Sequence, residues 1–382
     1  MNKLSYLEKL LDGVEVEWKT LEKVLKRTKG TKITAGQMKA LHKDNAPLKI
    51  FAGGKTVAFV DFKDIPEKDI NREPSIIVKS RGIIEFEYYD KPFSHKNEMW
   101  SYHSNNDAIS IKYIYYFLKI NEEYFQKIGG KMQMPQIATP DTDKFEVPIP
   151  CPDNPEKSLA IQAEIVRILD KFTALTAELT AELTARKKQY NYYRDQLMNL
   201  EEREDTREMS IGDIYDFQYG TGNTIPKSGG QYPVYGSNGI VGSHDKYNSE
   251  DSPVIGHIGA YAGIVNWGQG KHFVTYNGVI CRHKSKEVLQ KYAYHLLLLQ
   301  DFGSKSNSAS QPFVSYNILN APIVLVPPLQ EQARIVAILD KFDTLTSSIT
   351  EGLPREIELR QKQYEYYRDL LFSFPKPDSV TN

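Results

Sequence analysis

The apolar residues of one long segment follow the spacing of an amphipathic α-helix. From residue 161 to about residue 197, apolar side chains recur every three or four positions, at 161, 165, 168, 172, 175, 179, 183, 190, 193 and 197. Asn154-Pro155-Glu156 supplies a predicted N-cap, a proline in the first turn and an early acidic residue, which are typical of a helix start. Neither glycine nor proline follows until Gly212, so the pattern predicts one helix roughly 60 Å long.

A second stripe of the same kind runs from about Leu329 to Phe374. Its apolar positions are Ile335, Ile338, Phe342, Leu345, Ile349, Ile357, Tyr364, Tyr367 and Leu371. Glu351-Gly-Leu-Pro354 predicts a break or kink, with Pro354 opening a second helical piece. Two long stripes suit pairing with each other, and we predict an antiparallel coiled coil. The alternative is that each helix packs in a separate globular core.

The two helical segments are near copies of one another. Residues 165–172 read IVRILDKF and residues 335–342 read IVAILDKF, while 188–195 read KQYNYYRD and 362–369 read KQYEYYRD. A repeat of about 170 residues is too long for a solenoid unit and predicts two copies of a domain followed by a helix. The predicted helix–helix and partner interface comprises Ile165, Leu169, Phe172, Leu179, Leu183, Tyr193, Ile335, Leu339, Phe342, Ile349 and Tyr367.

Outside the helices, the pattern changes to short apolar runs separated by glycine-rich turns. Residues 207–325 contain Asn238-Gly239 and Asn277-Gly278, which are typical of hairpin turns, and a helix is expected near 286–299. Residues 17–146 follow the same layout with different residues, since 111–118 matches the segment around residue 292 and Pro135 is placed as Pro312 is.

The predicted fold class is therefore α+β, with two strand-rich α/β domains joined by two long helices in a pseudo-twofold internal repeat. The domains are expected at 1–146 and 206–325, the helical regions at 147–205 and 326–376, and a short tail at 377–382. One chain would then supply two similar scaffolds that carry two different surfaces.

Composition limits the classes of partner and compartment. The formal net charge of the 382 residues is −1, which argues against a protein that coats nucleic acid by charge alone. Residues 19–55 nevertheless hold ten Lys or Arg against two acidic residues, either a solvated face or a local nucleic-acid contact. Cys151 and Cys281 are the only cysteines, too few for a disulfide framework or a CxxC zinc site. With no apolar run for a signal peptide or membrane span, a cytoplasmic location is expected.

Motifs for catalysis are absent from the sequence. Asn-Pro-Pro-Tyr, His-Glu-x-x-His and Gly-x-Ser-x-Gly do not occur, which disfavours a base methylase, a zinc protease and a serine hydrolase. Gly53-Gly-Lys-Thr56 ends like a nucleotide-binding loop, but Lys49 stands where the leading glycine is required. The histidines show no metal spacing, so neither a catalytic nor a metal site is predicted.

Two further motifs carry a resemblance. The motif Val326-Pro-Pro-Leu-Gln-Glu-Gln332 precedes the second helix, and a diverged form of it, Ile149-Pro-Cys-Pro152, precedes the first. The tetrapeptide Thr176-Ala-Glu-Leu179 is repeated as Thr180-Ala-Glu-Leu183. In these features the chain resembles the specificity (S) subunit of type I restriction-modification systems, of the type IC kind. The resemblance covers essentially the whole chain, although the globular domains match only in layout.

The resemblance implies a non-catalytic subunit that reads a split target in double-stranded DNA. One domain would read each half-site, and the paired helices would set the spacer and dock two methyltransferase (M) subunits, with restriction (R) subunits joining. S-adenosylmethionine, ATP and Mg²⁺ would be bound by those partners, this chain would hold no cofactor, and no membrane is involved. A helical scaffold that binds only proteins is the alternative, and a standalone nuclease or methylase is third.

The loops that contain Gln133 and Gln311 are ones that the family uses near DNA, and the other candidate contacts follow from residue type and from their place after a predicted strand. Arginine can bond a guanine edge and glutamine an adenine edge, whereas lysine more often holds phosphate. The base candidates are Ser80, Arg81, Gln133, His257, Tyr261 and Gln311. The phosphate candidates are Lys29, Lys32, Lys55, Lys79, Lys131, Lys271 and Lys305. The tyrosine pairs at 192–193 and 366–367 are expected to pack in the coiled coil rather than to stack on bases.

Overall fold

The computed structural model describes residues 6–11, 13–130, 133–201, 203–222, 225–227, 229–306, 311–348 and 351–375. The chain divides into two compact units, one formed by residues 1–178 with 357–382 and the other by residues 179–356. We call them unit 1 and unit 2. Each contains one globular domain together with a part of each long helical segment.

Unit 1 has a short antiparallel strand pair, a four-stranded sheet and a three-stranded sheet. The pair is β1 (Val16–Thr20) with β9 (Glu146–Pro150). The four-stranded sheet has the order β2 (Lys26–Lys29), β8 (Trp100–His103), β5 (Ser75–Lys79) and β6 (Glu85–Tyr89), and the three-stranded sheet has the order β4 (Val57–Val60), β3 (Leu48–Phe51) and β7 (Phe93–His95). Its short helices are α1 (Tyr6–Leu11), α2 (Leu21–Val24), α3 (Ala35–Leu41), α4 (Ile111–Ile120), α5 (Glu122–Gly129) and α6 (Thr139–Asp143), with 3₁₀ turns at Phe62–Asp64 and Glu67–Asp69.

Unit 2 has a matching strand pair and a six-stranded sheet. The pair is β10 (Arg207–Ser210) with β17 (Ile323–Val326). The sheet has the order β11 (Tyr215–Tyr219), β16 (Gly278–His283), β14 (Ser249–Gly256), β15 (Val265–Val274), β12 (Tyr232–Gly236) and β13 (Gly239–His244). Its short helices are α8 (Ile211–Ile214), α9 (Gln290–Leu298) and α10 (Tyr316–Asn320).

The two units share one strand plan, which confirms the predicted repeat of the layout. The order β2-β8-β5-β6 in unit 1 corresponds to β11-β16-β14-β15 in unit 2, and β7-β3-β4 corresponds to β15-β12-β13, with one parallel pair in each. The difference is that β15 is continuous over ten residues, whereas its equivalent is divided into β6 and β7. Asp90-Lys-Pro92 lies at this division, and a proline cannot donate to the ladder.

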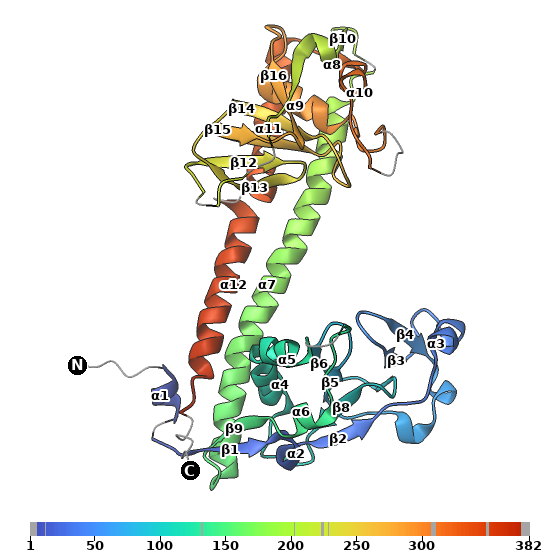
Figure 1. Ribbon diagram of the computed structural model, residues 1–382, viewed down its shortest axis with the longest axis vertical. Coiled ribbons are helices and arrows are strands. Elements are labelled where there is room, and N and C mark those ends of the chain that lie inside the picture. The colour runs from blue at the N-terminus through green and yellow to red at the C-terminus, as the bar shows by residue number, and fades with distance from the viewer. Residues whose placement is uncertain are drawn as a thin grey trace, which may run out of the picture. The chain divides into compact units, whose positions relative to one another are not determined.

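The first long helix agrees with the stripe that predicted it. Helix α7 runs from Pro155 to Met198, and Asn154 caps it by accepting the backbone N–H of Lys157 on its side-chain oxygen at 3.0 Å. In unit 1, α4 lies between the four-stranded sheet and α7 (Figure 1), and the Tyr116 hydroxyl donates to Asp170 of α7 at 2.6 Å. The second helical segment is broken where predicted, into α11 (Leu329–Ser347) and α12 (Gly352–Leu371).

A buried glutamine ties the start of each long helix to its globular domain. Gln162 accepts the N–H of Ser110 at 2.9 Å and donates to the Ala108 carbonyl at 3.0 Å, ahead of α4. Gln332 accepts the N–H of Leu289 at 2.8 Å and donates to the carbonyl of residue 287 at 2.9 Å, ahead of α9. Both glutamines are 0% exposed. This contact gives a structural reason for the glutamine that ends the Pro-Pro-Leu-Gln-Glu-Gln motif.

Removing this glutamine is expected to destabilise unit 2. Gln332→Ala leaves the N–H of Leu289 and the carbonyls of residues 287 and 327, which are partly or fully buried, without this partner, at a cost of about 2–4 kcal/mol in the free energy of unfolding. Gln330→Ala is the matched control, because Gln330 lies two residues earlier in α11 and is exposed. Urea unfolding followed by circular dichroism measures both variants. Equal stabilities of the two variants would contradict the role given to Gln332.

In each unit, a phenylalanine of one long helix stacks on a tyrosine of the other. Phe172 packs on Tyr367 in unit 1 with ring centroids 5.4 Å apart, and Phe342 packs on Tyr193 in unit 2 at 5.6 Å. These are equivalent residues with the helices exchanged. Within unit 1 the helical segments run antiparallel, since Ile161, before Phe172, clusters with residues 371–374, after Tyr367. In unit 2, Arg203, after Tyr193, pairs with Glu331, before Phe342, at 2.9 Å, so the predicted antiparallel pairing is confirmed within each unit.

Part of the predicted helix–helix interface also serves the globular cores. Ile165, Leu169, Ile335 and Leu339 are fully buried in clusters that contain residues of α4 in unit 1 and of α9 in unit 2. The alternative of globular packing therefore holds for these four positions, because the first turns of each long helix cover a domain. Leu179 and Leu183 are half-buried, and Ile349 lies outside the described residues.

Candidate nucleic-acid interface

Two loops far apart in the sequence lie together in unit 1. They are residues 80–83, after β5, and residues 133–137, and we call them the unit-1 loop pair. Arg81 and Gln136 form a β-bridge. The N–H of Gly82 donates to Pro135 at 2.9 Å, and the N–H of Ile137 donates to Ser80 at 3.0 Å. These bonds bring the two predicted base-reading segments into contact.

Unit 2 contains the equivalent arrangement, the unit-2 loop pair of residues 257–261 and 311–314. Ile258 and Phe313 form the bridge, and the N–H of Gly259 donates to Pro312 at 2.8 Å. The N–H of Val314 donates to the His257 carbonyl at 2.9 Å. The structure therefore confirms that the turn beginning at His257 corresponds to the one beginning at residue 80.

Both loop pairs need a glycine at the same point. Gly82 and Gly259 have φ angles of +78° and +89°, in the left-handed region that disfavours residues with a Cβ atom. A Cβ at either position would meet no atom within 4 Å, so the glycines serve backbone conformation rather than close packing. The turn geometry is shared while the neighbouring side chains differ.

Four of the six base candidates are accessible on these loops, and two are not. Arg81, Gln133 and Gln311 are exposed, and Tyr261 is 49% exposed. The predictions for Ser80 and His257 require correction. Ser80 is 2% exposed and donates its hydroxyl proton to the Glu98 carbonyl at 2.8 Å, while His257 is 4% exposed and stacks on Tyr219 at 4.1 Å. Both side chains support the loops instead of facing outward.

The predicted phosphate contacts divide in the same way. Lys29, Lys32, Lys55, Lys271 and Lys305 are exposed, and Lys131 lies outside the described residues. Lys79 is a correction, because it is 6% exposed and pairs with Glu85 at 2.6 Å and Glu87 at 2.8 Å. Burial alone would lower the pKa of Lys79, but the hydrogen bonds and charges of the two glutamates outweigh it and raise that pKa. Its charge is neutralised inside the unit.

A cluster of aromatic side chains beside the unit-2 loop pair was missed by sequence reasoning. Tyr219 stacks on Tyr316 with ring centroids 4.2 Å apart and an interplanar angle of 14°. The ring of Tyr276 meets His257 edge-on at 5.1 Å. These residues are widely separated in the sequence and follow no common spacing, so only the assembled sheet reveals them.

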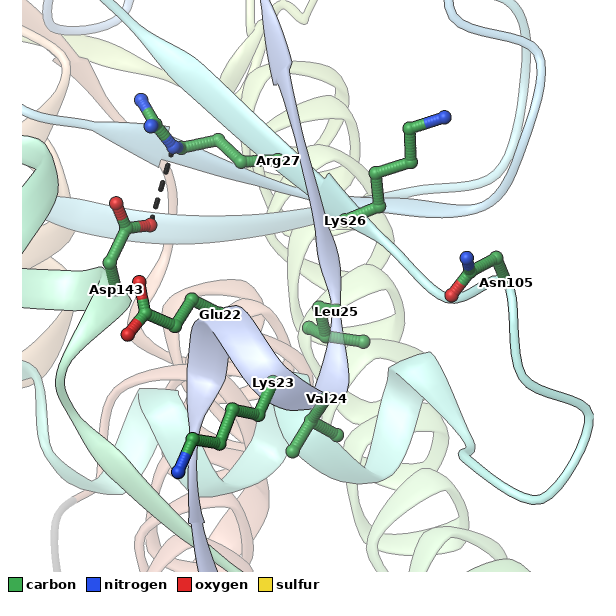
Figure 2. A pocket seen from close by; sticks show the side chains of 8 residues that line it. All are labelled: Glu22, Lys23, Val24, Leu25, Lys26, Arg27, Asn105 and Asp143. Atoms are coloured by element: carbon green, nitrogen blue, oxygen red, sulfur yellow. Dashed lines mark ion pairs between the residues drawn. The ribbon is translucent and has the colours of Figure 1, made fainter.

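A pocket of about 430 Å³ lies beside the basic edge strand of unit 1. Figure 2 shows that its lining carries both signs of charge, with Arg27 paired to Asp143 at 3.3 Å and the Glu22 carboxylate nearby. Lys23 and Lys26 also line it. Three basic and two acidic side chains thus line it, and none of the predicted contacts lies in it.

In the described ranges, no group of three or more His, Cys, Asp and Glu side chains is placed to hold a metal ion. Among the helices of the described part of the chain, none combines the length and apolar character needed to cross a membrane.

Comparison with known proteins identifies the family. The model of the type I restriction modification DNA specificity domain matches residues 15–186 and again residues 203–359. The specificity subunit of the type I restriction enzyme EcoR124I/EcoR124II of Escherichia coli is 39% identical over 420 residues, covering 100% of each chain. The EcoprrI specificity subunit of Escherichia coli is 37% identical over 383 residues, covering 92% of this chain and 93% of that one.

A solved structure shows the same fold. The type I restriction-modification S subunit from M. genitalium superimposes with a TM-score of 0.66 over 96% of this chain and 98% of that chain, at 18% sequence identity. The chain therefore belongs to the type I restriction-modification DNA specificity family. This assignment confirms the predicted class, a DNA-specificity subunit that is not itself an enzyme.

Proposed function

We propose that this chain selects the target of a type I restriction-modification complex by reading a split sequence in double-stranded DNA. Unit 1 reads one half-site with its loop pair and unit 2 reads the other. The observation that carries the proposal is that the two units repeat one backbone plan while the exposed residues of their loop pairs differ. Equal scaffolds with unequal loops suit a target whose halves are unequal.

The long helices are proposed to connect the readers and to dock the other subunits. Tyr192 and Tyr366 are equivalent residues of the two copies and are 61% and 64% exposed, so the expectation that they pack in the coiled coil is wrong for these two tyrosines. A repeated surface of this kind supports two M subunits, one on each copy, with R subunits joining the complex. S-adenosylmethionine, ATP and Mg²⁺ would be bound by those partners, and the complex would act in the cytoplasm.

The spacing of the target follows from the pitch of DNA. Readers that enter successive major grooves have centres about 10 to 10.5 base pairs apart, so half-sites of about three to five base pairs leave an unread spacer of about five to eight. A scaffold that binds only proteins would have no such target. Fluorescence anisotropy separates the two functions, because only a DNA reader shows sequence-dependent binding when its M subunits are present.

Arg81 provides a direct test at one base pair. Arg81→Ala is expected to weaken binding to the preferred duplex by about 1–3 kcal/mol and to relax discrimination at one position of the first half-site. Arg81→Lys keeps the charge but loses the bidentate geometry, so it should show the same loss of discrimination. Lys29→Ala should instead weaken binding to duplexes of every sequence alike, and it should lower the salt dependence of binding by the equivalent of about one phosphate contact.

The measurement is a titration of the complex with M subunits against duplexes that differ at single base pairs. Retention of full discrimination by both Arg81 variants would remove Arg81 from the reading surface. Binding that ignores sequence in the wild-type complex would favour the protein-binding scaffold.

A further inference from the structure

Four equivalent positions surround the loop pair in the two units. The equivalence of these positions follows from the strand register. β2 pairs with β8 in unit 1 as β11 pairs with β16 in unit 2, β5 pairs with β8 as β14 pairs with β16, and the β-bridge of each loop pair aligns the remaining positions. In unit 1 the residues are Lys29, Ser80, Asn97 and Thr139, and in unit 2 they are Tyr219, His257, Tyr276 and Tyr316. All four are aromatic in unit 2 and none is aromatic in unit 1.

Three of the unit-2 residues form one ordered stack, and the ring of Tyr276 meets His257 edge-on. Tyr219 lies between His257 and Tyr316, with ring centroids 4.1 and 4.2 Å apart and interplanar angles of 25° and 14°. Two hydrogen bonds fix the arrangement: the N–H of Tyr219 donates to the Tyr316 hydroxyl at 3.0 Å, and His257 Nδ1 donates to the Tyr276 carbonyl at 3.0 Å. Rings held in this way lose little conformational entropy when a ligand binds.

The stack has a buried end and an open rim. His257 is 4% exposed, whereas Tyr276 and Tyr316 are 46% and 36% exposed. The rim residues Tyr276 and Tyr316 are uncharged, whereas in unit 1 Lys29 stands at the position of Tyr219 and Arg81 at the position of Ile258. A positively charged side chain attracts phosphates whatever the base sequence. An uncharged aromatic ring is instead suited to apolar contact with a group on a base.

We propose that Tyr276 and Tyr316 read the second half-site through apolar contact with thymine methyl groups in the major groove. This inference rests on the proposed function and deepens it. The C5 methyl of thymine is the apolar group that base pairs display in that groove. The two halves of the target are then read by different chemistry, charge-assisted hydrogen bonds in unit 1 and aromatic contacts in unit 2.

Tyr276 is the residue to test, since its exposed ring can be removed without opening a core. The experiment measures binding of the full chain with its M subunits to duplexes in which each thymine of the second half-site is replaced by uracil, which removes only the methyl group. The wild-type complex should lose affinity at one or more of these positions. Tyr276→Ala should weaken binding by about tenfold and show no further loss with uracil, while Tyr276→Phe should behave as the wild type.

Asn97→Ala in unit 1 is the matched control, because Asn97 holds the equivalent exposed position. It should leave the response to uracil in the second half-site unchanged. The proposal is overturned if Tyr276→Ala keeps the wild-type affinity and uracil response. It is also overturned if that variant lowers the salt dependence of binding by about one phosphate contact. A wild-type complex that binds all sequences alike would overturn the proposed function itself.

Discussion

Insertion of one additional Thr-Ala-Glu-Leu after Leu183 is expected to change which DNA the complex recognises. The existing repeats, residues 176–183, lie within α7, where Thr176 and Thr184 donate their hydroxyl protons to the carbonyls four residues earlier at 2.9 Å. Four more helical residues add about 6 Å and turn the helix by about 40° beyond one turn. The apolar stripe therefore stays close to its original face.

The expected result is a target whose spacer is longer by about two base pairs, since each base pair occupies about 3.4 Å. Affinity for the original target should fall by about 100-fold or more, because one half-site then lies out of reach. Binding to a set of duplexes with spacers of increasing length measures the shift. A two-residue insertion, Thr-Ala, turns the helix by about 200° and should abolish specific binding. An unchanged preferred spacer in the four-residue variant would show that the length of the helix does not set the spacer.

Removal of the Phe342 ring is expected to loosen the helix pairing in unit 2. Phe342 stacks on Tyr193 at 5.6 Å and also meets Tyr190 at 6.3 Å. Phe342→Ala should lower the free energy of unfolding of unit 2 by about 2–3 kcal/mol. This is less than for a fully buried ring, because Phe342 is half-buried. Phe172→Ala removes the equivalent stack with Tyr367 in unit 1 and should cost a similar amount there.

Hydrogen–deuterium exchange reports the two effects separately. In Phe342→Ala the amides of α11 should exchange about 100-fold faster than in the wild type, while those of the unit-1 sheet stay protected. Leu329→Ala is the control, an apolar truncation in the same helix at a position that is 47% exposed, and it should change exchange little. Equal protection of α11 in the wild type and in Phe342→Ala would show that the stack contributes no stability.

The helical half of the fold could be predicted from the sequence because its signals are local and repeated. The stripe, the Asn154 cap and the break near Pro354 each lie within a few turns of chain, and the structure agrees with them. Which partner each apolar position meets was not predictable from the stripe. Ile165 and Ile335 face a domain core. The spacing of apolar residues along a helix is the same whether that face packs against another helix or against a domain.

The globular half was predictable in layout and less so in its surface. Ser80 and Lys79 both follow a plausible strand, but β5 lies between β8 and β6 and every one of its residues is buried. Burial on both faces removes the alternation that would have marked inward and outward positions. The aromatic stack of unit 2 was hidden for another reason. Its members come from separate strands, turns and helices, which only the sheet order brings together.

The proposed reading of one half-site by each unit is tested by profiling methylated bases in the genome of a host that carries this chain with its M subunits. The expected result is a split target with two unlike halves and an unread spacer of about five to eight base pairs. Arg81→Ala is also expected to change the first half alone and Tyr276→Ala to change the second half alone. A continuous target, or one variant that alters both halves together, would contradict the assignment of one unit to each half.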